Sequence, residues 1–133
     1  GGVDDVTYFT IVGGKVMMTL LVGEITTVFG AGANAMQIAH TPTVGTNVGT
    51  VAVLCATEDL ASYAEGDILT IGGGITTKLL PATTAGASPA MTGSGVILSA
   101  GALKFGAAGA TTGNWKWQLW YVPIDDGAYV VAN

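Results

Sequence analysis

The two side chains best suited to acid–base or covalent chemistry are a single histidine and a single cysteine. His40 could act as a general base only with a nucleophile and an orienting acid close by, and the sequence suggests neither. Cys55 lies in the apolar run TVAVLCAT, which is typical of a small buried hydrophobic residue. One cysteine cannot form an internal disulfide, and the sequence has no zinc-binding constellation. We therefore expect both residues to be structural.

The carboxylates include three adjacent pairs, and none has the spacing of a familiar site. Asp4-Asp5, Glu58-Asp59 and Asp125-Asp126 lack the alternating ligands of a calcium loop. Two carboxylates could serve as a glycosidase pair, but no arrangement of them is implied. Glu58-Asp59 suits the first turn of a helix, and Asp125-Asp126-Gly127 suits a turn. We therefore expect a protein that is not an enzyme, with no catalytic residues, no metal ligands and no cofactor.

The segment 30–35, GAGANA, matches the dinucleotide-binding fingerprint G-x-G-x-x-A in its loosest form. The genuine motif needs a helix that opens at the glycines and an acidic residue about 20 positions later. Here the following residues alternate like a strand, and positions 50–54 contain no acid. The segment is therefore interpreted as a glycine-rich turn.

The stretch NWKWQLWYVP, residues 114–123, contains all three tryptophans of the chain. If it is a strand, alternate side chains point to opposite faces. One face is almost wholly apolar and is expected to belong to the core; it carries Trp115, Trp117, Leu119 and Tyr121. The other face is mixed and carries Lys116, Gln118, Trp120 and Val122.

Trp120 is the exception on the mixed face. If it is exposed, it could stack on a sugar or anchor a protein contact, because aromatic residues are prominent among interface hot spots. The alternative is a strand buried on both faces, with Trp120 in a core. Trp120, Lys116 and Gln118 are therefore the candidate residues for an interface or a ligand contact.

The composition points to a protein that packs against others. Half of the residues are hydrophobic, 10% are charged and the mean hydropathy is +0.57, whereas about 25% of residues are charged in an average soluble domain. No apolar run approaches the roughly 18 residues of a membrane-spanning helix, so we expect no membrane association. A monomer rarely leaves so much apolar surface in water. We therefore expect contacts with other copies or with partners.

The charge balance argues against nucleic-acid binding. The chain has four lysines, no arginine and nine acidic residues, which gives a net charge of −5. Nucleic-acid binding depends on basic side chains that neutralise phosphates. The lysines are spread singly along the sequence, so we expect no nucleic-acid partner.

The elements that must position these residues are short, β-branched or aromatic runs bounded by glycine, which is the pattern of strands. A helix is expected only over 57–66, TEDLASYAEG, and a long loop over 81–95. A one-residue bulge at Gly23 would place both apolar sets of the second strand on one face. The strands are expected at 6–12, 15–29, 34–41, 49–56, 67–71, 78–80, 95–100, 102–105, 114–122 and 128–132.

This arrangement predicts an all-β fold. About eight antiparallel strands in this length indicate a β-sandwich or jelly-roll with one short helix, formed as a single domain over residues 1–133. Parallel α/β architectures are disfavoured because helices do not alternate with the strands.

The C-terminal pattern G-x-W-x-W-x-x-x-Y-x-P-I-D-D-G-A-x-V-x-A, from Gly113 to Ala132, resembles the end of small virion proteins of tailed bacteriophages. The run Phe9-Thr10-Ile11-Val12, followed by a strand that ends in Thr-Thr-Val-Phe-Gly, is similar too. So is the Thr-Pro-Thr-Val-Gly at 41–45. These motifs are structural rather than catalytic.

The resemblance implies a capsid decoration (cement) protein on the surface of the phage head. Such proteins are typically trimeric and bind across junctions between capsid subunits, so the implied partners are the major capsid protein and copies of the chain itself. The alternatives are a head or tail fibre or spike module, and a carbohydrate- or receptor-binding β-sandwich that uses an exposed tryptophan.

Overall fold

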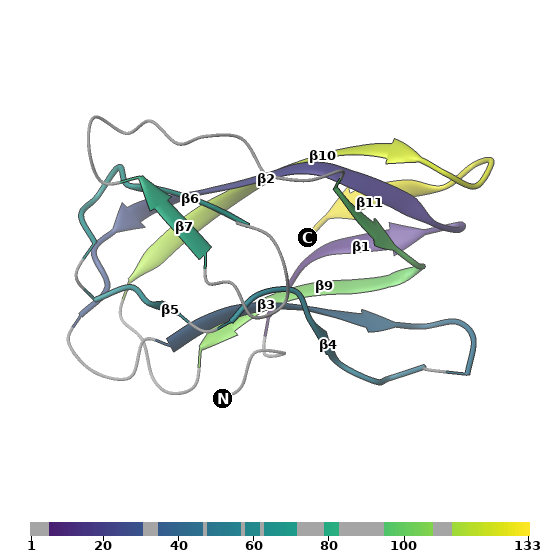
Figure 1. The fold of residues 1–133 in the computed structure, drawn as a ribbon, viewed down its shortest axis with the longest axis horizontal. Helices are drawn as coiled ribbons and strands as arrows, with labels where there is room; N and C mark the ends of the chain where they lie inside the picture. The colour runs from purple at the N-terminus through teal and green to yellow at the C-terminus, as the bar shows by residue number, and fades with distance from the viewer. Residues whose placement is uncertain are drawn as a thin grey trace.

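The computed structural model describes residues 6–30, 35–46, 48–56, 58–61, 63–71, 79–82, 95–107 and 113–133. Within them the chain forms two antiparallel sheets, and the predicted antiparallel β-sandwich is confirmed. In Figure 1 the long pair β2 and β10 runs along one side of the molecule, and β1, β9 and β3 run along the other. The described part of the chain contains no helix with the length and hydropathy needed to cross a membrane.

One sheet has six strands within the described residues, and β3 occupies a position next to its edge. Its continuous order is β11 (Tyr129–Ala132), β1 (Val6–Val12), β9 (Gly101–Ala107), β3 (Ala35–Pro42) and β4 (Ala52–Val53). A further two-residue strand, β5 (Glu58–Asp59), pairs with the first residues of β3.

The other sheet has five strands within the described residues and is built around β2. Its order is β10 (Asn114–Pro123), β2 (Val16–Thr27), β6 (Ile68–Ile71) and β7 (Leu79–Ala82). A short strand, β8 (Val96–Leu98), pairs with the beginning of β2, beyond β6. Thus β2 has β10 along one side and both β6 and β8 along the other.

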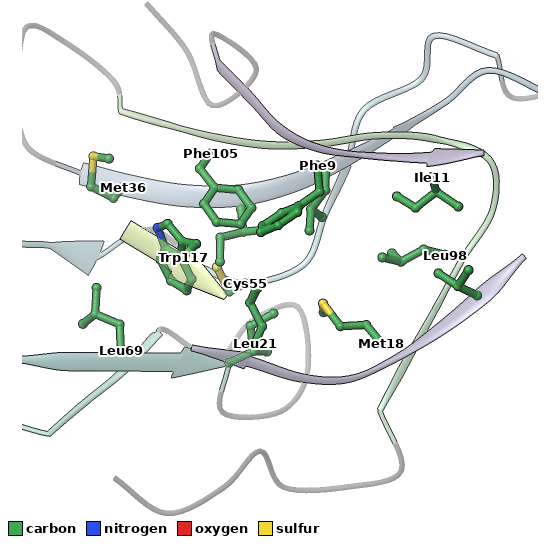
Figure 2. Packing of buried hydrophobic residues seen from close by; sticks show 14 of the residues in the cluster. Phe9, Ile11, Met18, Leu21, Met36, Cys55, Leu69, Leu98, Phe105 and Trp117 are labelled. Carbon is green, nitrogen blue, oxygen red and sulfur yellow. The ribbon is translucent and has the colours of Figure 1, made fainter. Parts of the chain in front are cut away.

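The core fills the space between the sheets because alternate side chains of each strand point inward. Figure 2 shows Phe9, Ile11 and Phe105 of one sheet facing Met18, Leu21 and Trp117 of the other. Phe105 is at the centre of the aromatic part, with its ring centroid 4.7 Å from that of Trp117 in an edge-to-face arrangement. Burial of this cluster is the main stabilising contribution that the fold offers.

The predicted bulge in β2 exists, but its predicted position was wrong. Leu20 pairs with Trp120 whereas Met18 pairs with Tyr121, so Thr19 is the additional residue. Its hydroxyl donates a hydrogen bond of 3.2 Å to the Trp120 carbonyl. As a result Leu21, rather than Leu20, follows Met18 into the core. A second shift in register, at Thr26, lies near the end of the strand.

Gly23 has a different role, which is to make room for a tryptophan. It pairs with Trp117 on β10, and a Cβ atom at this position would lie 2.7 Å from Cζ2 of the indole. The ring therefore packs directly on the backbone of β2. Glycine is needed there because of the close approach, and not because the strand bulges.

The short helix expected over 57–66 is wrong for the described residues of that segment. Glu58 and Asp59 form β5 against β3, and the chain then turns. The Asp59 carboxylate accepts a hydrogen bond from the Ala61 amide at 2.9 Å, so it stabilises a turn of the kind that aspartate favours over helix. Leu60 is fully buried beyond β5. Tertiary pairing and this burial outweigh the local helix signals.

The remaining predicted elements differ from the observed ones mainly in length. The strand expected over 49–56 is reduced to β4, although the Leu54 amide next to it still donates a hydrogen bond of 2.8 Å to the carbonyl of Ile38 on β3. The strand expected over 78–80 appears as β7, which extends to Ala82. Most of the loop expected over 81–95 lies outside the described residues.

The predicted turn at Asp125-Asp126-Gly127 is present and is held by an ion pair. Asp125 accepts a hydrogen bond of 2.8 Å from the backbone amide of Lys15 and contacts the Lys15 ammonium at 2.9 Å. A Cβ atom on Gly14 would lie 2.6 Å from the Asp125 Cβ. The β1–β2 connection, which links the two sheets, and the β10–β11 turn are therefore in close contact at one end of the sandwich.

Candidate interaction surface

The two faces of β10 are those predicted from the sequence. Trp117 is buried, and Trp115, Leu119 and Tyr121 are partly buried against the core. Lys116, Gln118, Trp120 and Val122 are exposed. Because 49% of Trp120 is accessible, the alternative of a strand buried on both faces is wrong for this chain.

Trp115 and Trp117 are core residues and do not offer a platform for a ligand. Their ring centroids are 5.1 Å apart with an angle of 80° between the planes. The Trp115 indole N–H donates to the Tyr8 hydroxyl at 2.8 Å, and Trp115 also contacts Phe29 edge-to-face. The aromatic-rich stretch therefore divides into an inner part that stabilises the fold and an outer part that is free to bind.

The outward face next to Trp120 is apolar over three strands. Val122 of β10 pairs with Met17 of β2, and Met17 pairs in turn with Ile97 of β8. Trp120 pairs with Leu20 on the same face. Val122 is 49% exposed and Ile97 is 63% exposed. We call the set Trp120, Val122, Leu20, Met17 and Ile97 the outer patch.

The outer patch is followed along β10 by polar residues. Gln118 pairs with Val22. Lys116 pairs with Glu24, and their side chains form an ion pair with an N–O distance of 3.2 Å. Since both side chains are well exposed, water and salt screen this ion pair and it contributes little to stability. All three candidate residues, Trp120, Lys116 and Gln118, thus lie on one outward face.

Sequence reasoning missed Ile97, Met17 and Leu20 as members of this surface. The alternation in GVILSA does set Ile97 apart from Val96 and Leu98, and this was the available signal. This alternation does not reveal that β8 pairs with β2, because the two strands are far apart in the sequence. Leu20 was also missed, because simple alternation with Val16 and Met18 would turn it inward, and the bulge at Thr19 turns it outward.

His40 has a structural environment, as expected. It is buried on β3, and its Nε2 atom lies 2.9 Å from the Ser99 carbonyl oxygen, so this nitrogen carries the proton. Burial lowers the pKa of His40, and the hydrogen bond with Ser99 opposes part of that change. The ring is therefore uncharged at neutral pH.

Cys55 is a buried core residue, also as expected. Burial raises the pKa of its thiol, while a backbone hydrogen bond involving Ile38 lowers it in part. The thiol is therefore protonated at neutral pH, and a protonated thiol is a poor nucleophile.

Metal ligands and the dinucleotide fingerprint find no support in the described residues. No group of three or more histidine, cysteine, aspartate or glutamate side chains comes together among them as a metal site would require. Of the three acidic pairs, Asp4-Asp5 lies outside the described residues. The glycine-rich segment leads into the strand β3 rather than into a helix, so it lacks the context of a dinucleotide site.

Comparison with known proteins adds no relative: no family model, no curated protein and no solved structure matches the chain.

Proposed function

We propose that the chain is a structural protein of a virus particle, a decoration (cement) subunit that binds and stabilises the head shell of a tailed bacteriophage. The observation that carries the proposal is the outer patch across β10, β2 and β8, in which Trp120, Val122 and Ile97 are exposed and Met17 and Leu20 are half-buried. Exposed apolar surface of this kind is typical of protein-binding surfaces. The resemblance of residues 113–132 to virion proteins of tailed bacteriophages is the reason for proposing a phage head as the particle.

The chemistry of the outer patch suits a protein partner. Trp120 provides a large, flat side chain of the type that dominates binding energy when a partner covers it. Met17 and Leu20 extend the apolar area, and the Lys116–Glu24 ion pair forms a polar border. A weak contact made by one subunit becomes effective when it is repeated over a shell.

The proposed partners are the major capsid protein and copies of the chain itself, assembled as a homotrimer on the outer surface of the capsid. The trimer and this location follow from the resemblance. No role for nucleic acid, membrane, cofactor or catalysis is part of the proposal.

The proposal is tested by mixing the purified protein with empty, expanded heads of the phage that encodes it and measuring co-sedimentation. We expect saturable binding and shells that withstand higher temperature. Trp120→Ala should weaken binding by at least about tenfold. Val48→Ala, which truncates a valine that is 57% exposed and lies outside the outer patch, is the matched control. Absence of binding by the unaltered protein contradicts the proposal.

A second candidate is a carbohydrate- or receptor-binding module, including one at the end of a fibre or spike. It is favoured by the position of Trp120 beside Gln118 and near the Lys116–Glu24 pair, because an aromatic face next to hydrogen-bonding groups suits a sugar. Titration with a glycan panel should then quench or shift tryptophan fluorescence. Trp120→Phe should remove that signal, because Trp115 and Trp117 pack in the core.

A further inference from the structure

The edges of the two sheets differ in how well they are protected against pairing with another strand. Natural sheets protect an edge by keeping it short or by placing proline or charged side chains, especially lysine, on it. Two of the edge strands, β4 and β5, have only two residues each. Two others, β7 and β11, have four residues each, and β7 contains Pro81.

The edge formed by β10 has little of this protection. It is ten residues long, and among the described residues it pairs only with β2. Its single proline, Pro123, is its last residue. Its single charged side chain, Lys116, lies near the first residue of the strand and forms an exposed ion pair with Glu24 of the neighbouring strand. The backbone groups on the outer side of β10 can therefore accept a further strand.

We propose that β10 pairs with β10 of a second copy of the chain, antiparallel and about a two-fold axis, so that two five-stranded sheets form one continuous sheet. Backbone donors and acceptors along a strand edge are complementary to another strand edge. Within the described residues, β10 is the longest edge strand, so β10 of a second copy is the longest strand edge that could pair with it. Antiparallel pairing also continues the pattern of the sheet to which β10 belongs.

The side chains of β10 allow this contact. The strand carries no carboxylate, so the net charge of −5 on each copy is not concentrated at the contact. Lys116 lies near the first residue of the strand. In an antiparallel pair of β10 strands centred near Gln118 or Leu119, it faces the C-terminal half of the other strand, so the two Lys116 side chains do not face each other. Trp120 and Gln118 of the two copies then become cross-strand neighbours on one face, where such pairs contribute to stability.

The test is sedimentation analysis of the full chain over a concentration series, combined with hydrogen exchange of the β10 amides. We expect concentration-dependent association that doubles the mass of the smallest species, whether that species is a monomer or the homotrimer proposed above. Alternate amides along 114–123 should exchange more slowly in the associated form, because alternate residues of an edge strand acquire partners. Gln118→Lys should weaken association by about tenfold or more, since it brings two added charges together near the axis.

Val48→Lys is the matched control, because it adds the same charge at an exposed position outside β10. Equal association of both variants would overturn the proposal. So would a protein that does not associate up to about 1 mM, or association that leaves the β10 amides unchanged. Association that stops in Gln118→Lys alone, with protection of alternate amides, supports it.

The pairing of β10 does not depend on the proposed function. A chain that binds empty heads but shows no β10 pairing contradicts this inference and leaves the decoration function intact. A chain that pairs through β10 but does not bind heads contradicts the decoration function and leaves this inference intact.

Discussion

At the residue scale, the contact between Gly23 and Trp117 shows how a single hydrogen atom in place of a side chain can shape a core. The indole of Trp117 packs on the backbone of β2 at the position where a Cβ atom would be 2.7 Å away. Phe105 contacts the same ring from the opposite sheet. The ring therefore has little freedom to move away from an added methyl group.

We predict that Gly23→Ala lowers the free energy of unfolding by about 1–3 kcal/mol, the usual cost of overpacking a core. Chemical denaturation monitored by circular dichroism measures this change. The control is the same substitution in a Trp117→Leu background, where the loss should be much smaller because the ring is gone. An equal loss in both backgrounds contradicts the proposed contact.

The ion pair between Lys15 and Asp125 provides a second prediction at this scale. Backbone and side-chain hydrogen bonds from Lys15 lower the pKa of Asp125, so its contribution to stability is present above the carboxylate's unfolded pKa and disappears as the pH falls through the lower, folded pKa. Asp125→Asn should lower the melting temperature at pH 7, and less so at strongly acidic pH. Asp126→Asn is the matched control. Similar losses in the two variants would show that the contact is unimportant.

His40 is a basic group, whereas Asp125 is acidic, but both make the stability of the fold decrease as the pH falls. Burial lowers its pKa below the unfolded value, so the folded chain favours the neutral ring. Stability is complete above the unfolded pKa of about 6.5 and decreases as the pH falls below it. His40→Gln should make the melting temperature less sensitive between pH 7.5 and pH 5. An unchanged pH dependence in this variant would contradict the argument.

At the element scale, the bulge at Thr19 allows one strand to supply two sets of core residues. Val16 and Met18 precede it, and Leu21 and Ile25 follow it; all four are fully buried. Strict alternation would send one of the two sets outward. The partner strand β10 keeps its alternation throughout, so the change in phase is confined to β2.

We therefore predict that deleting Thr19 destabilises the fold by about 3 kcal/mol or more, because it forces one apolar set of β2 out of the core. Thermal unfolding and the dispersion of amide signals measure the effect. Deletion of Gly45, in an exposed turn after β3, is the control and should be far better tolerated. A stable, well-ordered Thr19 deletion would contradict the role of the bulge.

The elements also show how far the sequence could predict this molecule. The alternation in β10 assigned its inner and outer faces correctly, because period-two burial is a local property. The change of phase in β2 was also detectable, but its position was not, since an added residue anywhere between Met18 and Ile25 gives the same pattern. Only the pairing with Trp120 and Tyr121 places it at Thr19.

Long-range pairing also explains the remaining differences. The segment beginning at Glu58 has acceptable helix signals, and its capture by β3 as β5 could not be seen locally. The outer patch was recognised only through its β10 members, Trp120 and Val122, because Ile97 reaches it by the pairing of β8 with β2. The candidate surface could thus be predicted as one strand face, but not as a patch over three strands.

At the scale of the whole molecule, low charge and exposed apolar side chains act together. Each copy carries a net charge of −5, which repels other copies over the Debye length of about 10 Å at 0.1 M salt. The outer patch and the edge of β10 are apolar or use backbone hydrogen bonds, so salt does not weaken them directly. Screening should therefore remove repulsion while leaving the attraction in place.

We predict that self-association strengthens as the salt concentration rises from about 0.05 M to about 0.5 M. Light scattering at fixed protein concentration and pH 7 measures this change. An interface held by ion pairs would weaken over the same range, so the sign of the salt dependence separates the two cases. Weaker association in high salt would contradict an apolar or backbone-mediated contact.

The perpendicular arrangement of Trp115 and Trp117 has a consequence for optical measurements. Two indoles with centroids 5.1 Å apart and planes inclined by 80° have electronic transitions that couple, and such coupling produces paired circular-dichroism bands of opposite sign. The bands vanish when the rings separate. The protein thus contains a built-in optical reporter of its closed core, independent of the exposed Trp120, and the variants that keep both Trp115 and Trp117 can be checked against it without a label.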